Sequence, residues 1–161
     1  MKETTYIIVG YGGRGRGFAN LITKNAQLCA KVVAVAEPNP EKVEIAKREC
    51  SLSDDQIYHT ATDLFKQPKL ADAVVIATQD QMHAEEAIAA MNLGYHILLE
   101  KPMAVTLEDC MAIEEAQRIA NRVVCVCHSL RYNLVYAHLK KMISSGVLGE
   151  VVNIDQLEGV N

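Results

Sequence analysis

The sequence predicts an α/β fold in which a parallel sheet is covered by helices on both faces. Short apolar runs rich in β-branched residues alternate along the chain with segments whose apolar residues recur at helical spacing. Each run is apolar throughout, which is typical of strands buried on both faces. The first run ends in the spacing Gly10-x-Gly12-x-x-Gly15, a pattern typical of a dinucleotide-binding turn. These observations together predict a doubly wound, Rossmann-type domain.

Six strands are expected in the first 127 residues. They span residues 6–9, 32–36, 57–58, 73–77, 97–99 and 123–127. The shortest of them, 57–58, is expected at an edge of the sheet, and the others are apolar enough to lie inside it.

Helices are expected between these strands. The first follows Gly15 and would bury Phe18, Leu21 and Ile22, which recur at helical spacing. Asn39 before Pro40 is the favoured pairing of N-cap and first position for the second helix. Further helical segments are expected at residues 63–65, at 81–93, from Thr106 onward with Asp109 in a capping box, and at 134–145.

Composition excludes several classes of function. The net charge of −4 and the lack of a basic cluster argue against a nucleic-acid surface. No apolar run approaches the length of a membrane span, and the N-terminal residues show no signal-peptide pattern. The cysteines have neither disulfide nor metal-site spacing, so we expect reduced, mostly buried thiols, no metal site and a cytoplasmic location. They are Cys29, Cys50, Cys110, Cys125 and Cys127.

The composition changes character after residue 127. A polar and aromatic stretch precedes the last helix, and residues 151–157 alternate like a strand with one buried face. A single amphipathic strand needs partners. We therefore expect a cofactor domain at 1–127, and a linker, helix and first strand of a substrate or oligomerisation domain at 128–161. The full-length protein is expected to be a homo-oligomer.

Each glycine of the first turn has a steric role. Gly10 permits the tight turn out of the strand, Gly12 has no Cβ to hold off a pyrophosphate, and Gly15 lets the helix lie close to the strand. The pyrophosphate would lie at the helix N-terminus, where free N–H groups favour an anion. The cofactor-binding residues expected here are Gly10, Tyr11, Gly12, Gly13, Arg14 and Gly15. The alternative is a glycine-rich loop without a ligand.

Glu37 ends the second strand, about 20 residues beyond Gly15, where an acidic side chain can accept both ribose hydroxyls of adenosine. It would repel a 2′-phosphate, and no arginine occurs at 38–41, so NAD is favoured over NADP. The alternative is a solvated surface glutamate.

Two further turns follow buried strands and so lie at the same edge of the sheet. Thr78, Gln79 and Asp80 follow the strand at 73–77, and His83 begins the next helix. Cofactor contact is one interpretation, but for Asp80 a helix N-cap and for His83 a satisfied side chain at the helix start are favoured.

Glu100-Lys101-Pro102 follows the strand at 97–99. A partly desolvated lysine there could donate a hydrogen bond to a substrate hydroxyl or carbonyl, with Glu100 holding the nicotinamide ribose or orienting the lysine. Physical reasoning alone slightly favours a surface ion pair. The Lys101–Pro102 bond, in a tight turn, is a candidate for a cis peptide.

Several segments together resemble the Gfo/Idh/MocA family of NAD(P)-dependent dehydrogenases. They are Gly10–Gly15, Ala36–Pro40, Ala77–His83, Leu99–Ala104, and Leu130–Asn133 followed by Ser145–Gly149. The resemblance implies that Lys101 is the substrate-side catalytic lysine, that Glu100 faces the cofactor, and that the substrate is a small carbohydrate or polyol.

This sequence departs from the family pattern in two ways. Gln79 stands where the family usually has proline. The family's aspartate and histidine that complete proton transfer come from its second domain and have no counterpart here, since Asp155 is not a plausible substitute.

The sequence suggests three functions. The first is the cofactor-binding part of an NAD-dependent oxidoreductase that moves hydride between nicotinamide and a sugar or polyol-like hydroxyl, inactive as these 161 residues alone. The second is a non-catalytic NAD-binding sensor or module. The third, a methyltransferase, fits Glu37 but leaves Glu100-Lys101-Pro102 unexplained.

Overall fold

The computed structural model describes residues 2–157 and residue 159. The chain divides into two compact units, Met1–Cys127 and His128–Asn161. None of the helices in the described part is long and apolar enough to cross a membrane.

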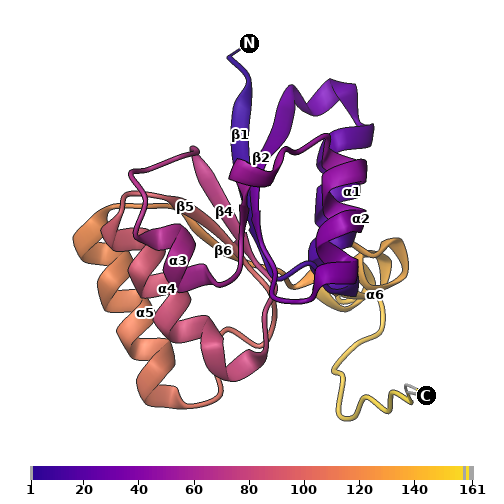
Figure 1. Ribbon diagram of the computed structural model, residues 1–161. Coiled ribbons are helices and arrows are strands. Elements are labelled where there is room, and N and C mark those ends of the chain that lie inside the picture. The colour runs from indigo at the N-terminus through magenta and orange to yellow at the C-terminus, as the bar shows by residue number, and fades with distance from the viewer. Residues whose placement is uncertain (1, 158, 160–161) are drawn as a thin grey trace. The chain divides into compact units, whose positions relative to one another are not determined.

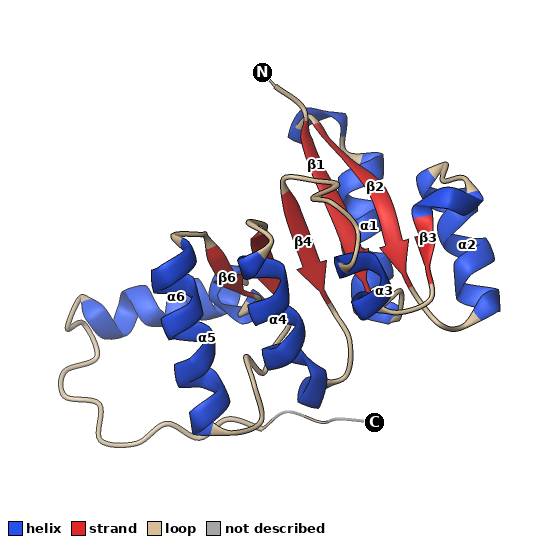
Figure 2. Cartoon of the chain, turned by 60° about the vertical axis from the view of Figure 1, so that its left-hand side comes forward, coloured by secondary structure: helices blue, strands red, loops and turns tan. Residues whose placement is uncertain are grey.

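The first unit is built on a six-stranded sheet in which every neighbouring pair is parallel (Figures 1 and 2). The strands are β1 (Thr4–Val9), β2 (Ala30–Ala36), β3 (Ile57–Tyr58), β4 (Ala73–Ile76), β5 (His96–Leu99) and β6 (Val124–Val126). Their order is β3-β2-β1-β4-β5-β6, so the direction of winding reverses between β1 and β4. The predicted Rossmann-type α/β fold is confirmed, and β3 is the edge strand that was expected.

Helices cover both faces of this sheet, with α1 and α2 on one side and α3, α4 and α5 on the other (Figure 1). Their bounds are α1 (Gly13–Lys24), α2 (Pro40–Cys50), α3 (Ala61–Phe65), α4 (His83–Asn92) and α5 (Leu107–Ala120). Successive side chains of a strand point to opposite faces, so Ile7 and Val9 pack with the α3–α5 layer while Ile8 packs with α1 and α2.

Local capping signals place the helix starts as expected. The Asn39 side chain accepts hydrogen bonds from the N–H groups of Glu41 and Lys42, and Pro40 occupies the first helical position. Thr106 caps α5 by accepting from the Asp109 N–H. These caps satisfy backbone donors that a helix cannot pair internally, which is why they can be read from sequence.

Two burial expectations are wrong. Leu21 is 56% exposed although Phe18 and Ile22 of the same helix pack toward the sheet. Positions 18 and 22 are one turn apart and share a face, whereas position 21 is rotated away from it. The expectation of mostly buried thiols is also wrong, because four of the five cysteines are only partly buried and Cys125, on the outermost strand β6, is exposed. Cys50, Cys110, Cys125 and Cys127 are free thiols.

The second unit contains a 3-10 turn (Ser129–Tyr132) and α6 (Leu134–Ser144), whose N-cap is Asn133. The strand expected at 151–157 is not formed, because its backbone finds no neighbouring strand among the described residues to complete a ladder. Gln156 of that segment donates a hydrogen bond from Nε2 to the Tyr136 hydroxyl of its own unit at 2.8 Å.

Candidate functional site

A cavity of about 250 Å³ opens at the carboxyl ends of β1, β2 and β4. This is the point where the strand order reverses, which is where open α/β sheets bind their ligands. Its lining includes Gly10, Gly12, Glu37, Lys42, Thr78 and Glu86. The glycine turn, the end of β2 and the turn after β4 therefore share one cavity.

The glycines of the first turn differ in what surrounds them. Gly10 has φ +85°, and a Cβ there would lie 2.7 Å from the Ala77 carbonyl oxygen. A Cβ on Gly15 would lie 1.9 Å from the Gly10 carbonyl oxygen, so this glycine allows α1 to approach the turn. A Cβ on Gly12 would meet nothing within 4 Å. Gly12 is therefore not required by packing, and its open side belongs to the cavity.

Gly12 is also the N-cap of α1 and makes no side-chain capping bond. The first-turn N–H groups of α1 thus begin beside the cavity without a side-chain acceptor, an arrangement suited to an anion. The turn and the helix start together fit the pyrophosphate of a dinucleotide.

Glu37 is 5% exposed, and its hydrogen bonds connect the glycine turn to the end of β2. One carboxylate oxygen accepts the Tyr11 N–H at 2.7 Å, and the other accepts the Asn39 N–H at 3.0 Å. The Lys42 ammonium lies 3.9 Å away. A carboxylate has about four acceptor positions, so Glu37 keeps acceptor capacity for hydroxyl groups in the cavity.

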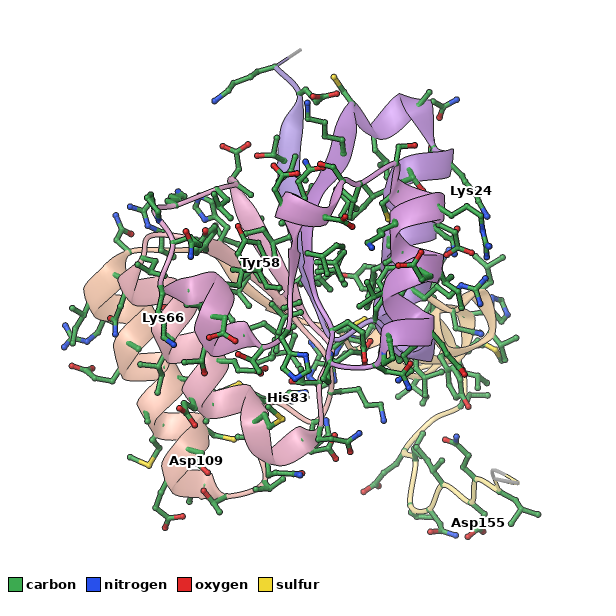
Figure 3. All side chains as sticks on the ribbon, viewed as in Figure 1. Lys24, Tyr58, Lys66, His83, Asp109 and Asp155 are labelled. Atoms are coloured by element: carbon green, nitrogen blue, oxygen red, sulfur yellow. The ribbon has the colours of Figure 1, made fainter. Side chains whose placement is uncertain are left out.

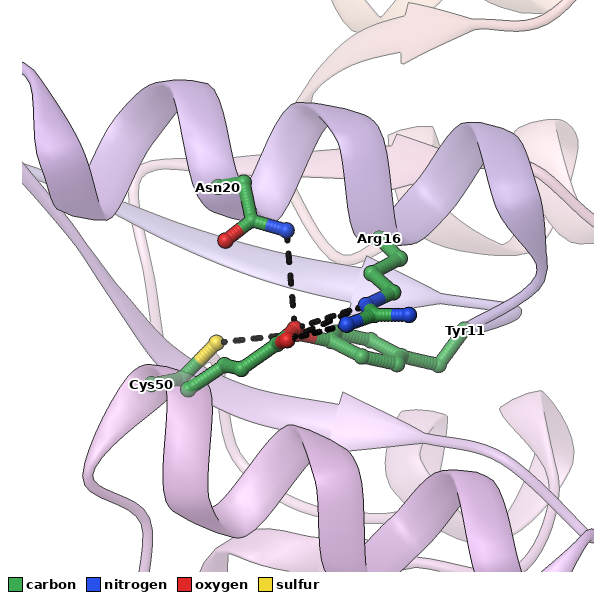
Figure 4. A network of polar contacts seen from close by, with 5 residues as sticks. Tyr11, Arg16, Asn20 and Cys50 are labelled. Carbon is green, nitrogen blue, oxygen red and sulfur yellow. Dashed lines mark hydrogen bonds and ion pairs between the residues drawn. The ribbon is translucent and has the colours of Figure 1, made fainter.

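The Tyr11 side chain does not line the cavity but is buried with the α1–α2 layer. Its hydroxyl donates to Glu49 at 3.0 Å, and burial, together with Cys50 and Glu49, raises the pKa of this phenol. Glu49 also accepts from Arg16 and Asn20, so one carboxylate joins α1, α2 and the turn (Figure 4). Hydrogen bonds led by those from Arg16 lower the pKa of Glu49 to about 2.

The turn after β4 contributes Thr78 and Gln79 to the cavity lining. The Thr78 hydroxyl donates to Glu86, whose pKa is raised by burial. Asp80 is exposed and does not cap a helix: it is the first residue of a 3-10 turn (Asp80–Met82) whose N-cap is Gln79, without a side-chain bond. The capping prediction for Asp80 is wrong because the chain enters α4 through this extra turn.

His83 is fully buried and is not among the residues that line the cavity. Its Nδ1 lies 2.8 Å from the Pro102 carbonyl oxygen, so its ring contacts the turn after β5.

Glu100 is 5% exposed and is held from two sides. The Arg14 Nε donates to Glu100 Oε1 at 2.8 Å, and the Arg14 Nη2 lies 2.6 Å from the same oxygen. The Lys101 N–H donates to Glu100 Oε2 at 3.2 Å. Burial alone would raise the pKa of this carboxyl, but the Arg14 guanidinium and the Lys101 N–H lower it overall. Arg14 therefore links the glycine turn directly to the end of β5.

Lys101 has an exposed side chain and lies outside the cavity lining, and the Lys101–Pro102 peptide is cis, as anticipated. The sequence reasoning missed four residues at or near this edge: Lys42, His59, Thr60 and Glu86. Lys42 could have been found, since it lies in the first turn of the helix that follows Glu37.

The sequence profile of an oxidoreductase family with an NAD-binding Rossmann fold, Gfo/Idh/MocA, matches residues 4–128. Inositol 2-dehydrogenase of Salmonella typhimurium is 33% identical over 150 residues, which cover 89% of this chain and 42% of that protein. A 1-carboxy-3-chloro-3,4-dihydroxycyclohexa-1,5-diene dehydrogenase of Comamonas testosteroni is 31% identical, with coverage of 89% and 36%.

The fold is also that of solved members. The crystal structure of myo-inositol 2-dehydrogenase from Lactobacillus plantarum superposes with a TM-score of 0.85 at 24% identity, over 94% of this chain and 44% of that one. The chain thus spans roughly two fifths of the length of the relatives it matches. On the profile match over most of its length, the chain belongs to the Gfo/Idh/MocA oxidoreductase family.

Proposed function

We propose that this chain is the cofactor-binding part of an NAD-dependent oxidoreductase that transfers hydride between nicotinamide and a hydroxyl group of a sugar or polyol. The observation that carries the proposal is the cavity at the reversal point, where the open side of Gly12 and the carboxylate of Glu37 face the same space. The family to which the chain belongs supports the same activity.

The residues present fit a dinucleotide. The open Gly12 and the uncapped first turn of α1 would hold the pyrophosphate, and the remaining acceptor positions of Glu37 would take the adenosine ribose hydroxyls. Thr78 and Gln79 would contact it from the turn after β4.

Glu37 supports NAD over NADP, because its buried carboxylate would face a 2′-phosphate directly. Lys42 would favour NADP instead, since its positively charged ammonium lies 3.9 Å from that carboxylate and would attract a 2′-phosphate. The lysine side chain is 45% exposed and the glutamate 5%, so solvent screens the attractive charge more than the repulsive one. We therefore expect the repulsion of a 2′-phosphate by Glu37 to outweigh its attraction by Lys42, so that NAD is preferred over NADP.

The nicotinamide ring, when bound, supplies the group that exchanges hydride with the substrate carbon. Lys101 would donate a hydrogen bond to the reacting oxygen and so favour charge that develops there. Glu100 is fastened by Arg14 and by the Lys101 N–H, so we assign it to holding this turn at the cofactor side.

The remaining parts of the proposal concern the whole protein. Relatives named inositol 2-dehydrogenase support a small carbohydrate or polyol as substrate, and we expect a homo-oligomer. The cysteine spacing, which fits neither a disulfide framework nor a metal site, supports a cytoplasmic location. The 161-residue chain alone is expected not to turn over substrate, because Lys101 supplies no proton acceptor and no wall for the substrate.

Calorimetric titration with NAD+ and NADP+ tests the proposal. The unaltered chain should bind NAD+ at least tenfold more tightly than NADP+, a ratio that corresponds to about 1.4 kcal/mol. Gly12→Val should lose measurable binding of both while keeping the circular dichroism spectrum, since the added carbons extend into open space rather than into the protein. Equal or tighter binding of NADP+ would overturn the role of Glu37, and binding of neither would overturn the function.

A further inference from the structure

Two buried polar side chains lie at the start of α4, and the cofactor contacts proposed above use neither of them. His83 is fully buried and Glu86 is 6% exposed. They are three residues apart and so lie on neighbouring positions of one helix face. Each reaches a different turn at the carboxyl edge of the sheet, which is the region around the His83 label in Figure 3. The start of α4 therefore contacts both the turn after β4 and the turn after β5.

The contact of His83 fixes the position of its ring proton. Nδ1 lies 2.8 Å from the carbonyl oxygen of Pro102, and a carbonyl oxygen only accepts hydrogen bonds, so Nδ1 carries the proton. Nε2 is buried and has no partner among the described residues. The geometry therefore places a proton on Nδ1, whatever the state of Nε2.

This bond gives a polar anchor to a segment that otherwise packs against the core through the partly buried Met103 and Ala104. Residues 101–106 lie outside regular secondary structure, and proline has no N–H to donate. Before Lys101, Glu100 is held by its N–H bond to the Ile76 carbonyl at 2.9 Å and by Arg14. After Lys101, the hydrogen bond from His83 to Pro102 holds the chain.

We propose that His83 is a positioning residue, which fixes the backbone of Lys101 by donating its Nδ1–H to the Pro102 carbonyl. Glu86 accepts from Thr78 on the same helix, so α4 sets the spacing between the cofactor-side turn and the lysine turn. The catalytic meaning of this spacing rests on the proposed function, but the hydrogen bond and its effect on Lys101 do not.

A matched pair of substitutions separates positioning from packing. In His83→Asn the amide nitrogen takes the place of Nδ1 and can still donate to Pro102. In His83→Gln the amide nitrogen takes the place of Nε2 and points away from that carbonyl. Both replace a buried ring by a smaller amide, so a role limited to packing predicts similar changes in both.

The readout is NMR spectroscopy of the 161-residue chain. We expect His83→Gln to move the Pro102 carbonyl carbon upfield and the Met103 amide nitrogen with it, as a carbonyl does on losing a donor, and to lower the heteronuclear NOE of the Lys101 amide. We expect His83→Asn to restore all three signals toward those of the unaltered chain. Equal signals in the two variants, or a Pro102 carbonyl unchanged in His83→Gln, would overturn the proposal.

The unaltered chain provides a test that does not require either variant to fold. The ¹⁵N shifts of the His83 ring should show a protonated Nδ1, and an unprotonated Nδ1 would overturn the proposal. NAD+ titration of the same sample judges the proposed function separately. A chain that fails to bind NAD+ but shows the protonated Nδ1 and the Pro102 response would contradict the function and support the positioning role.

Discussion

Gly15 gives the sharpest prediction for stability. It lies in the first turn of α1, and a Cβ placed on it would be 1.9 Å from the carbonyl oxygen of Gly10, where ordinary contact begins at 3.4 Å. The opposing atom is backbone, so no side chain can rotate away. Gly10 is itself fixed, because it has φ +85° and donates to the Ala36 carbonyl at 2.9 Å. Gly15→Ala therefore forces α1 and the turn apart by about 1.5 Å.

The cost follows from three contributions. Overpacking in a tight interior costs about 1–3 kcal/mol, and a backbone-to-backbone clash belongs at the upper end. The shift also strains the hydrogen bond from the Tyr11 N–H to Glu37 at 2.7 Å, worth about 1 kcal/mol. The higher helix propensity of alanine offsets about 1 kcal/mol of this cost, because alanine is favoured over glycine inside a helix by about that amount. We expect Gly15→Ala to lower the free energy of unfolding by about 3 kcal/mol, or the melting temperature by roughly 12 °C.

Gly17 provides the matched control, because it lies in the same helix and a Cβ there would meet nothing within 4 Å. Gly17→Ala should raise stability by about 0.5–1 kcal/mol through helix propensity alone. Urea unfolding followed by circular dichroism measures both variants. If Gly15→Ala is as stable as the unaltered chain, or if Gly17→Ala is destabilised equally, the steric reasoning is refuted.

Three other substitutions test separate features. The pKa of Glu49 is lowered to about 2 in the folded chain. Its contribution to stability is therefore present above the unfolded pKa of about 4.3 and is lost as the pH falls toward 2. Glu49→Gln should remove this loss, so the melting temperature of the variant should depend less on pH between about pH 5 and 2. Leu64 is fully buried, and Leu64→Ala should cost about 2–5 kcal/mol in urea unfolding. Glu37→Gln removes the charge that faces a 2′-phosphate while Lys42 remains, so calorimetry should show the NADP+ to NAD+ affinity ratio rise about tenfold; an unchanged ratio would contradict the assignment.

The fold could be predicted because its signals are local. The strand β4 reads as a continuous apolar run, and Asn39 before Pro40 marks the start of α2 within two residues. The features that could not be predicted depend on neighbours distant in sequence. Cys125 is exposed because no strand lies beyond β6, and residues 151–157 form no strand because no partner pairs with them among the described residues.

The residues of the candidate site also include some that could be predicted from the sequence and some that could not. The glycine spacing and Glu37 could be identified because each role follows from residue type and from a position at a strand end. The pairing of Arg14 with Glu100 could not, since it depends on the register that brings α1 beside the end of β5. Glu86 was missed because its role appears only when Thr78 is seen to donate to it.

These long-range contacts explain why the glycine turn can act as a binding site. The Tyr11 N–H is held by Glu37, which directly follows β2, and the Tyr11 hydroxyl is held by Glu49 from α2. Arg14 is held by Glu100 at the end of β5. The turn is thus fixed by three elements on its flanks, while a Cβ added to Gly12 would meet nothing within 4 Å. A loop ordered before its ligand arrives loses little conformational entropy on binding, so the contacts that it makes contribute more fully to affinity. The side chains of this turn therefore serve to order it, and its backbone presents the surface on which a dinucleotide would bind.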